Sequence, residues 1–419
     1  MKDSGLPSFG IVPKDWKTTK LKNILLIRKE KSFGYGRLLS VYLDRGVISY
    51  DDSTGKQVHK PSEDLSDYQR VYINDFVLNN QQAWRGSVGV SQYDGIISPA
   101  YYVYQFSPDC IPCYMNYVLR DKCMVQQYEI ASRGVGSIQR NLFIPDFRTI
   151  SMYLPLPSEQ TQIVHFLDRK CTAIDIAIEK TKKSIEKLEE YKKAVITKAV
   201  TKGIDPNVKM KDSGVEWIGE IPEEWKISKF KFHAKAKSEK NPGNATILSL
   251  YREYGIVIKD SRDDNHNRTS LDTSSYRYVE VNDFVVNKMK AWQGSVAVSE
   301  YTGVVSPAYY VYKITDAEIY PLYLHYLLRS CYKDEFRRLS GGIRIGQWDL
   351  PSEALENTLI LQPSYTEQVN ITEYIKKHTT AVEQLIEKKK KAIEKWEEYK
   401  KSLIYYAVTG KIDCRGEEL

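Results

Sequence analysis

The stretch IEKLEEYKK at Ile185–Lys193 is written twice in the chain, since it returns as IEKWEEYKK at Ile393–Lys401 with one leucine replaced by tryptophan. Each copy lies in a longer run of mixed polar and apolar residues, Ser158–Lys202 or Ser364–Val408. Within these runs apolar positions recur at alternating steps of four and three, the spacing of a helix that packs against a partner helix. We therefore predict two long helices that pair with each other.

Sequence signals bracket both predicted helices. Ser364 with Glu367 three residues later forms a capping box, which indicates a helix start. Gly203 and Gly410 are predicted to end the two helices. The predicted helix-pair seam consists of Leu167, Ile174, Ile178, Ile185, Leu188, Val195, Ile375, Val382, Ile386, Ile393, Trp396 and Leu403.

The repeat extends well beyond the helices. MKDSGLPSFGIVPKDWK at the start returns as MKDSGVEWIGEIPEEWK from Met210. The longest match aligns Val71–Tyr104 with Val279–Tyr312, where 22 of 34 positions are identical, including the words NDF, GSV and SPAYYVY. The sequence thus contains a duplication of about half its length and no short-period solenoid.

Each half begins with a globular part in which short β-like runs are bounded by Asn-Asp, Gly and Pro. A helical pattern follows at Pro112–Gln127 and Pro321–Leu339, and then a glycine-rich turn at Arg133–Asn141 or Ser340–Trp348. The predicted fold class is α+β, with two tandem α/β units alternating with two long helices that pair as an antiparallel coiled coil. The predicted parts are globular unit 1–157, central helix 158–203, globular unit 204–363, C-terminal helix 364–410 and tail 411–419.

Antiparallel pairing would place the two globular units at opposite ends of a rod. A helix of forty residues is roughly 60 Å long, and successive major-groove half-sites lie about 34–36 Å apart. Such a rod can separate two DNA readers by about one turn of duplex.

Composition leaves the choice of partner open. The net charge of +7, from 61 basic and 54 acidic residues, fits a nucleic-acid binder with a local basic face and equally an ordinary enzyme. The 31 tyrosines against 11 phenylalanines suit a protein that uses its surface for binding. Tyrosine-rich sheets would give the same composition.

The cysteines do not form a metal-binding pattern. Cys110 and Cys113 make one C-x-x-C without a second pair, and the repeat replaces them by Ile319 and Leu322. We therefore expect no metal site and buried, apolar cysteines. The sequence shows no signal peptide and no apolar run of membrane-spanning length, so we expect a cytoplasmic protein without membrane contact.

No catalytic motif is present. The sequence contains no Walker-type phosphate loop, no G-x-G-x-x-G, no G-x-S-x-G and no H-E-x-x-H. The [NDS]-P-P-[YFW] tetrapeptide of an aminomethyltransferase is also absent, and the histidines are dispersed. The acidic and lysine residues of EKLEEYKK are expected to be solvated flanking charges of a helix. Together these absences argue against an enzyme.

Polar and basic residues gather in the globular units at positions from which loops can reach DNA. Arg, Asn and Gln pair with base edges, whereas Lys mostly contacts phosphate. The DNA-binding candidates are Lys29, Lys31, Tyr35, Arg37, Gln81, Gln82, Arg85, Arg133, Gln139, Arg140 and Asn141 in the first copy, and Lys237, Lys240, Asn241, Lys288, Lys290, Gln293, Arg344 and Gln347 in the second.

The repeat keeps its scaffold words and exchanges polar positions between them. The pair Gln81–Gln82 becomes Met289–Lys290, and Arg85 becomes Gln293. Two copies of one frame with different polar residues are expected to read two different half-sites, although any single position could equally be an ordinary surface residue. The tryptophan of each AW-x-GSV word is expected to be a structural anchor.

The whole chain resembles the specificity subunit of type I restriction-modification systems. The features that carry the resemblance are the two-fold repeat, the EEYKK helices, and the short motifs that open and close each half. These are the M-K-D-S-G openings at Met1 and Met210, P-S-E-Q at Pro157 with its counterpart at Thr366–Gln368, and V-T-x-x-I-D at Val200–Asp205 and Val408–Asp413.

The resemblance implies that each globular unit is a target recognition domain for one half of a bipartite site on double-stranded DNA. The paired helices would set the spacer and bind two modification subunits, which carry S-adenosylmethionine and methylate adenine. Restriction subunits would join through the complex and use ATP and Mg²⁺ for cleavage. This chain would hold no cofactor of its own and would be no enzyme.

Two other readings remain open. A coiled-coil adaptor that joins proteins would show no salt-dependent binding to duplex DNA. A self-sufficient DNA-modifying enzyme would transfer methyl groups as an isolated chain.

Overall fold

The computed structural model describes residues 1–32, 34–52, 61–135, 139–252, 255–259, 272–342 and 348–414, with the main chain alone at Val135 and Gln139. The chain divides into two compact units. Unit 1 comprises Met1–Thr181 and Lys390–Leu419, and unit 2 comprises Lys182–Lys389. Each unit thus contains one globular part and about half of each long helix.

Unit 1 is built around an antiparallel four-stranded sheet with the order β4-β11-β8-β9. Antiparallel pairs β1-β2, β3-β14, β5-β6, β7-β10 and β12-β13 surround it. The elements of its globular part are β1 (Lys2–Asp3), β2 (Ile11–Val12), β3 (Lys17–Lys20), α1 (Leu21–Ile24), β4 (Leu25–Ile27), β5 (Leu39–Tyr42), β6 (Gly46–Ser49), β7 (Gln69–Val71), β8 (Phe76–Asn79), β9 (Val88–Val90), β10 (Gly95–Ile97), β11 (Tyr101–Phe106), α2 (Pro112–Arg120), α3 (Lys122–Ile130), β12 (Ser132–Val135), β13 (Gln139–Leu142), α4 (Ile144–Thr149) and β14 (Ser151–Leu154).

Unit 2 repeats this plan around the sheet β18-β25-β22-β23, with the pairs β15-β16, β17-β26, β19-β20 and β21-β24. The elements of its globular part are β15 (Met210–Asp212), β16 (Glu220–Pro222), β17 (Lys226–Lys229), β18 (Ala234–Lys237), β19 (Leu248–Tyr251), β20 (Gly255–Ile258), β21 (Arg277–Val279), β22 (Phe284–Asn287), β23 (Val296–Val298), β24 (Gly303–Val305), β25 (Tyr309–Ile314), α6 (Pro321–Ser330), α7 (Lys333–Leu339), α8 (Ser352–Glu356) and β26 (Leu359–Gln362).

The central strands are apolar because both faces of the sheet are covered. Side chains alternate between the faces of a strand. In β8, Phe76 and Leu78 join the core that includes α2, whereas Val77 joins a separate cluster with residues of the β5-β6 hairpin. Phe284 and Val285 of β22 divide between two clusters in the same way.

The two short helical patterns each form two helices instead of one. In unit 1 the chain leaves the helix at Asp121, which has the extended angles φ −73° and ψ 154°. The Asp121 carboxylate accepts a hydrogen bond from the main-chain N–H of Cys123 at 2.9 Å and so caps α3. In unit 2 the break between α6 and α7 falls at Cys331–Tyr332.

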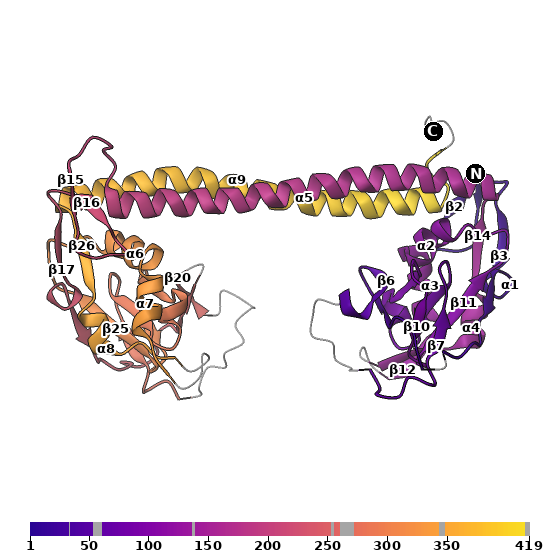
Figure 1. Cartoon of the computed structure of the whole chain (residues 1–419), viewed down its shortest axis with the longest axis horizontal. Helices are drawn as coiled ribbons and strands as arrows, with labels where there is room; N and C mark the ends of the chain where they lie inside the picture. The colour runs from indigo at the N-terminus through magenta and orange to yellow at the C-terminus, as the bar shows by residue number, and fades with distance from the viewer. Residues whose placement is uncertain are drawn as a thin grey trace. The chain divides into compact units, whose positions relative to one another are not determined.

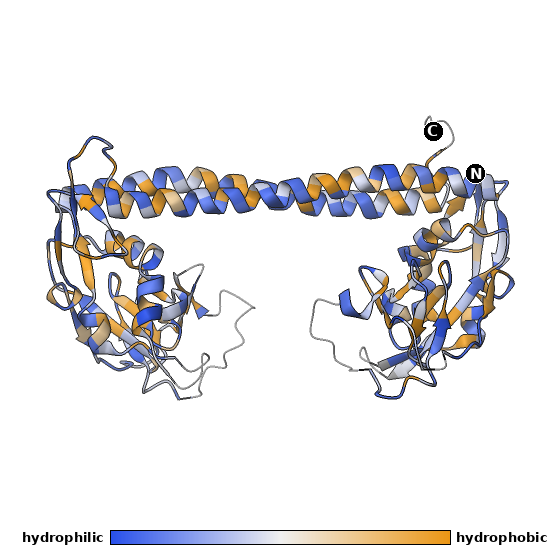
Figure 2. Cartoon of the chain, in the orientation of Figure 1, coloured by the Kyte–Doolittle hydropathy of each residue, from blue (hydrophilic) through white to orange (hydrophobic). Residues whose placement is uncertain are grey.

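The two long helices are α5 (Pro157–Lys202) and α9 (Tyr365–Val408), and they pack together (Figure 1). The pairing is antiparallel. In unit 1, Lys400 Nζ lies 2.6 Å from a carboxylate oxygen of Asp175, and in unit 2, Lys192 Nζ lies 2.9 Å from Glu383 Oε1. Along both helices hydrophobic and hydrophilic residues alternate, as Figure 2 shows.

The predicted seam is buried most completely in the first half of each helix, up to Ile178 and Ile386, and again at Leu403. The buried members are Leu167, Ile174, Ile178, Ile375, Val382, Ile386 and Leu403. The half-buried members are Ile185, Leu188, Val195 and Ile393. Trp396 is the exception, because 41% of its surface is exposed and its ring packs edge-on against Tyr399. Its assignment to a buried seam was therefore wrong, since the bulky indole replaces a leucine and turns outward.

A buried glutamine fastens the start of each long helix to the globular part. Gln160 is fully buried; its Oε1 accepts from the Ile111 N–H at 2.8 Å, and its Nε2 donates to the carbonyls of Asp109 and Pro155 at 2.9 Å. Gln368 makes the equivalent three bonds in unit 2.

The predicted capping box is half present. Ser364 Oγ accepts from the Glu367 N–H at 3.3 Å, but the Glu367 carboxylate accepts from the indole of Trp225 instead of closing the box.

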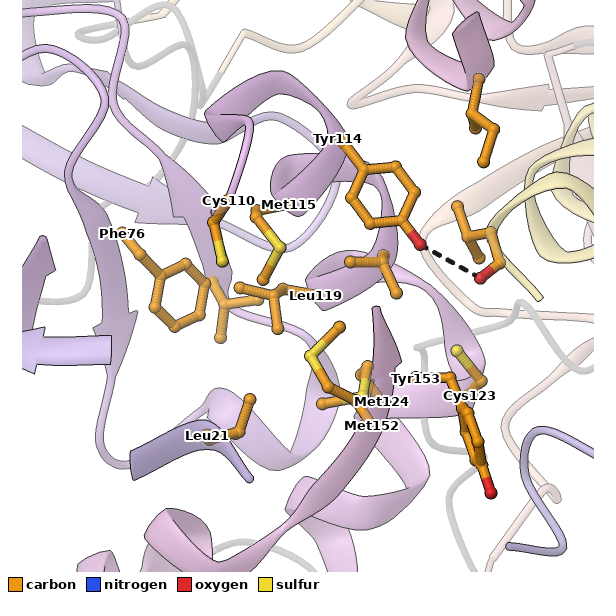
Figure 3. Close-up of a cluster of buried hydrophobic side chains, with 14 of the residues drawn as sticks. Leu21, Phe76, Cys110, Tyr114, Met115, Leu119, Cys123, Met124, Met152 and Tyr153 are labelled. Carbon is orange, nitrogen blue, oxygen red and sulfur yellow. Dashed lines mark hydrogen bonds between the residues drawn. The ribbon is translucent and has the colours of Figure 1, made fainter. Parts of the chain in front are cut away.

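The far ends of the helices also enter the cores. Figure 3 shows this core in unit 1, where the Tyr114 hydroxyl donates to the carbonyl of Val408 at 3.5 Å beside Met115 and Met124. In unit 2 the Tyr323 hydroxyl donates to the carbonyl of Val200 at 3.3 Å. Each long helix is thus tied to a globular part at both ends.

Candidate nucleic-acid interface

Each globular part presents a polar turn between two strands of its central sheet. We call residues 79–87 and 287–295 the Trp turns, because each contains the AW word as a short 3-10 helix, at Ala83–Arg85 or Ala291–Gln293. The alanine of each word is fully buried, whereas the residues before it lie at the surface. The turn therefore has a fixed base and an accessible rim.

The tryptophan and the glycine of the repeated word shape the turn. The indole N–H of Trp84 donates to the carbonyl of Gln81 at 3.0 Å, and that of Trp292 donates to the carbonyl of Met289 at 3.1 Å. The following glycine has φ of 97° in unit 1 and 88° in unit 2, a region in which side chains are disfavoured. The interpretation of these tryptophans as structural anchors fits this geometry.

In unit 1 the fold brings two groups of sequence candidates together. The Leu142 N–H at the end of β13 donates to the carbonyl of Asn80 at 3.0 Å, which places the β12-β13 hairpin beside the Trp turn. The guanidinium groups of Arg85 and Arg140 lie 5.7 and 5.1 Å from the centre of the Trp84 ring. Two arginines and one indole thus form a cationic edge, with Arg140 also 3.1 Å from Glu129.

The candidates near β4 and β5 form a second group in unit 1. Lys31 pairs with Asp67 at 2.7 Å, and Arg70 lies 5.2 Å from the centre of the Tyr35 ring. Arg37 lies 5.1 Å from the centre of the Tyr93 ring. Lys29, Gln81 and Asn141 are also exposed, and Gln82 is half-buried.

Arg133 stands apart from these contacts. It pairs with Asp146 at 2.9 Å, and its guanidinium lies 3.6 Å from the centre of the Phe143 ring. Its side chain is nevertheless largely exposed.

In unit 2 the turn meets the segment that begins at Trp348. Lys288 Nζ lies 2.8 Å from Asp349 Oδ2, and the main-chain N–H of Leu350 donates to the carbonyl of Lys288 at 3.0 Å. Trp292 and Trp348 pack edge to face with ring centres 5.6 Å apart. A second tryptophan therefore takes the place that arginine holds beside the first Trp turn.

The remaining unit 2 candidates divide by exposure. Lys240 and Lys290 are exposed, while Gln293 is half-buried. The amide of Asn241 is half-buried and donates to Thr273 Oγ1 at 3.0 Å, so its donor is used within the fold.

Lys237 was wrongly predicted to contact DNA. It is buried, and its ammonium lies 2.7 Å from Glu280 and 3.0 Å from Asp283. Arg28 and Asp75 make the corresponding pair in unit 1, at 2.7 Å. The position therefore neutralises a buried aspartate beside the central sheet, a contact between distant residues that local sequence patterns do not reveal.

Three candidates lie outside the described residues in whole or in part. Arg344 and Gln347 are among the residues that the structure does not describe, as is the side chain of Gln139.

The cationic candidates with internal partners keep their charge. Hydrogen bonding to Asp349 raises the pKa of Lys288, and hydrogen bonding to Asp67 raises that of Lys31. For Lys237 burial disfavours the charge, but hydrogen bonds to Glu280 and Asp283 outweigh it and raise the pKa. These side chains are protonated at neutral pH.

Sequence reasoning missed Tyr50, Lys259 and Met289, which line the pockets beside the Trp turns together with the candidates Gln81, Lys290 and Gln293. Tyr50 and Gln81 line the pocket of unit 1, and Lys259 and Met289 line that of unit 2. Alignment of the two halves across Leu38–Tyr50 would have revealed the exchange of Tyr50 for Lys259, because LLSVY and ILSLY fix the register there.

Among the described residues no group of three or more His, Cys, Asp and Glu side chains could hold a metal ion. Cys110 is buried, and its thiol lies near the Ser107 hydroxyl, whereas Cys113 at the start of α2 is exposed. Burial raises the pKa of the Cys110 thiol, which makes it a poor ligand and nucleophile.

The family model for the type I restriction modification DNA specificity domain matches residues 13–190. A putative type I restriction enzyme specificity subunit, MjaX, from Methanocaldococcus jannaschii is 24% identical over 96% of this chain and 95% of its own length. The chain is similar over almost its whole length to type I restriction-modification specificity subunits. The resemblance seen in the sequence is thereby confirmed.

Solved specificity-subunit structures support the fold. A chain from work on complex assembly and conformational transition of the type I R-M system matches with a TM-score of 0.70 and 12% identity, covering 96% of this chain and all of that one. The HsdS subunit from Thermoanaerobacter tengcongensis matches with a TM-score of 0.54 and 13% identity, covering 98% of this chain and all of its own. The predicted α+β fold with paired long helices is confirmed.

The matching family model describes a DNA specificity domain, and the similar proteins are named as specificity subunits of type I restriction enzymes. In the described part of the chain, none of the helices has the length and apolar character needed to cross a membrane.

Proposed function

We propose that each globular part of this specificity subunit reads one half of a bipartite site on duplex DNA. The supporting observation is the pair of Trp turns, which share their main-chain hydrogen bonds but differ in side chains. Gln81 and Arg85 in unit 1 correspond to Met289 and Gln293 in unit 2. Because base edges are distinguished by hydrogen-bonding and apolar contacts, one frame with different rim residues would recognise two different half-sites.

The helix pair is proposed to set the spacer. An α-helix rises 1.5 Å per residue, so the 46 residues of α5 correspond to roughly 69 Å. Half-sites on one face of duplex DNA recur about every 34–36 Å. A helix of this length is sufficient to hold two readers at half-sites one helical turn apart.

Exposed aromatic and leucine side chains of the helices are the proposed contacts for two modification subunits. Trp396 and Tyr399 in unit 1 are 41% and 52% exposed, and Tyr191 and Leu385 in unit 2 are 52% and 43% exposed. Aromatic side chains are enriched at protein interfaces. Each unit would offer one such surface to one modification subunit.

In this assembly the chain would select the DNA sequence, and its partner subunits would catalyse the reactions. S-adenosylmethionine would bind to the modification subunits, which would methylate adenine, and ATP and Mg²⁺ would act in the restriction subunits. This chain is proposed to bind no cofactor and to act in the cytoplasm, where the DNA and these partners are found.

Methylome sequencing of a host that makes this chain together with a type I modification subunit tests the proposal. The expected result is adenine methylation in a two-part motif with a fixed gap. A continuous motif, methylation by the isolated chain, or no methylation from a complex shown to have formed would each overturn it.

A second experiment separates the spacer role of the helix pair from the DNA-reading role of the globular parts. A heptad-length block is inserted in both helices, after Thr181 and after Lys389, where the two units divide. The gap in the methylated motif is expected to change while both half-sites stay the same. Altered half-sites with an unchanged gap would contradict the spacer role.

A further inference from the structure

A concave pocket lies beside the Trp turn of each unit, and the two pockets are built from corresponding positions of the repeat. The pocket of unit 1 has a volume of about 230 Å³ and includes Asn79 and Tyr101. That of unit 2 has a volume of about 510 Å³ and includes the counterparts Asn287 and Tyr309. Corresponding hollows in both copies indicate a shared feature of the frame.

The floor of the pocket is the same in both units. The side chain of Asn79 hydrogen-bonds Tyr101, and that of Asn287 hydrogen-bonds Tyr309. Burial raises the pKa of both tyrosines, which therefore stay neutral. Because the polar groups of the floor hydrogen-bond one another, the structure of the floor does not depend on which side chains form the rim.

Main-chain bonds hold the rim, so its side chains can differ without disturbing the fold. The Tyr50 N–H donates to the carbonyl of Leu38 at 2.8 Å, and the Lys259 N–H donates to the carbonyl of Ile247 at 2.9 Å. At the other side of the rim, the tryptophan indoles bond the main-chain carbonyls of residues 81 and 289. None of these bonds uses the side chain of Tyr50, Gln81, Lys259 or Met289.

The rim side chains that differ between the units have unlike chemistry. Unit 1 presents the aromatic Tyr50 and the amide of Gln81, whereas unit 2 presents the ammonium of Lys259 and the thioether of Met289. The unit 2 pocket is further lined by Lys290. Two cations therefore border the larger pocket, and an apolar side chain that is 47% exposed stands at its edge.

A pocket can receive only a part of DNA that protrudes, and on a duplex that part is the sugar-phosphate backbone. Lysines beside serine and tyrosine hydroxyls suit phosphate oxygens. A side chain on the rim of such a seat then points toward the neighbouring groove. A glutamine amide pairs with adenine through N6 and N7, whereas an apolar side chain fits the methyl group of thymine.

We propose that each pocket seats the sugar-phosphate backbone of one DNA strand and that the rim residue, Gln81 or Met289, reads the adjacent base pair. The inference rests on the proposed function and adds the place of contact and the specificity-determining position in each unit. It also assigns to the unit 2 pocket, through Lys259 and Lys290, a larger share of the salt-dependent affinity.

Exchange of residues between the two copies tests the reading role with variants that the frame already accommodates. Gln81→Met and Met289→Gln are each combined with the modification subunit, and the methylomes are sequenced. Each exchange is expected to change one base-pair preference by roughly 5- to 150-fold in the half-site of its own unit. The other half-site should be unchanged. Gln126→Met alters an exposed residue of α3 away from the pocket, so it serves as the control and should leave the motif unchanged.

The seating role is tested by the salt dependence of duplex binding to the complex. Lys259→Tyr with Lys290→Gln installs the unit 1 residues, and the log–log salt slope is expected to fall by about 1.8, since each phosphate contact contributes about 0.9. Lys229→Gln with Lys235→Gln removes two exposed lysines elsewhere in unit 2 and should leave the slope unchanged.

The outcomes separate the inference from the proposed function. If the wild-type complex methylates a two-part motif but both rim exchanges leave it unaltered, or the two lysine pairs have equal effects on the slope, the pocket assignment is overturned and the function stands. If the wild-type complex yields no two-part motif, both are overturned.

Discussion

Acid is expected to destabilise unit 2 through one histidine that unit 1 lacks. His325 Nδ1 accepts a hydrogen bond from the Val298 N–H at 3.2 Å, which requires an unprotonated nitrogen. Burial, and next the nearby charge of Arg329, lower its pKa from 6.5 to about 4. The same position in unit 1 is Asn116, whose Oδ1 accepts from the Val90 N–H at 3.0 Å and does not titrate.

The sign follows from proton binding. Between pH 6.5 and 4 the unfolded chain binds a proton at His325 that the folded chain excludes, so stability is full above pH 6.5 and falls as the pH drops toward 4. One pKa unit corresponds to about 1.4 kcal/mol. The ceiling of the loss is therefore about 3 kcal/mol, and because the ring is only half-buried by surface area we expect roughly 1–3 kcal/mol.

The assay compares wild type with His325→Asn at the same pH, which cancels the other titrations. Unfolding in urea is carried out at pH 7 and at pH 4.5. Peptide-resolved hydrogen exchange measures the stability of α6 in unit 2 and of α2 in unit 1 separately. The two proteins should match at pH 7, and the variant should be more stable at pH 4.5, in unit 2 alone. The reciprocal Asn116→His should create the same acid sensitivity in unit 1. Equal loss of stability in wild type and His325→Asn between the two pH values would refute the reasoning.

Two further predictions concern the junctions between long helices and globular parts. Gln160→Leu leaves the Ile111 N–H and the Pro155 carbonyl without their hydrogen-bond partner. Urea unfolding should therefore show unit 1 destabilised by about 2–5 kcal/mol. Gln162→Leu, at an exposed position of the same helix, is the control and should change the stability little. In thermal unfolding, Gly410→Ala should lower the stability more than Gly203→Ala. Both glycines have a positive φ, so either substitution introduces about 1–2 kcal/mol of backbone strain. Only the alanine at position 410 would also place its Cβ 2.4 Å from the ring of Pro13. If the two variants of either pair lost the same stability, the contacts of Gln160 or the approach of residue 410 to Pro13 would not determine the stability of unit 1.

The sequence predicted the parts of the molecule that depend on local pattern. The 3.5-residue spacing identified both long helices, and the internal repeat identified two units of one design. The words AW and GSV were correctly interpreted as scaffold, since the indole bonds a carbonyl three residues earlier and the glycine occupies a left-handed turn. Such features are visible because their partners are close in sequence.

Features that depend on distant partners could not be predicted. Lys237 looked like a surface cation, but its partner Asp283 directly precedes β22, 46 residues away in the sequence, and removes it from solvent. The start of α5 was recognised as a helix signal, yet the three bonds of Gln160 became visible only when strand, loop and helix were brought together. The pockets beside the Trp turns likewise join segments that are distant in the sequence.

The division of each long helix between two units has a consequence for the order of synthesis. Unit 2 is one continuous stretch and can fold once Lys389 has left the ribosome, whereas unit 1 is begun first and completed last. At about 5–20 residues per second, residues 182–389 delay its second piece by roughly 10–40 s. During that interval the first half of α5 has no α9 beside it, and the unit 1 core lacks Leu403 and Val408. The N-terminal unit therefore waits with an open apolar face, and the speed of translation through the second half of the message governs how long it is exposed to aggregation.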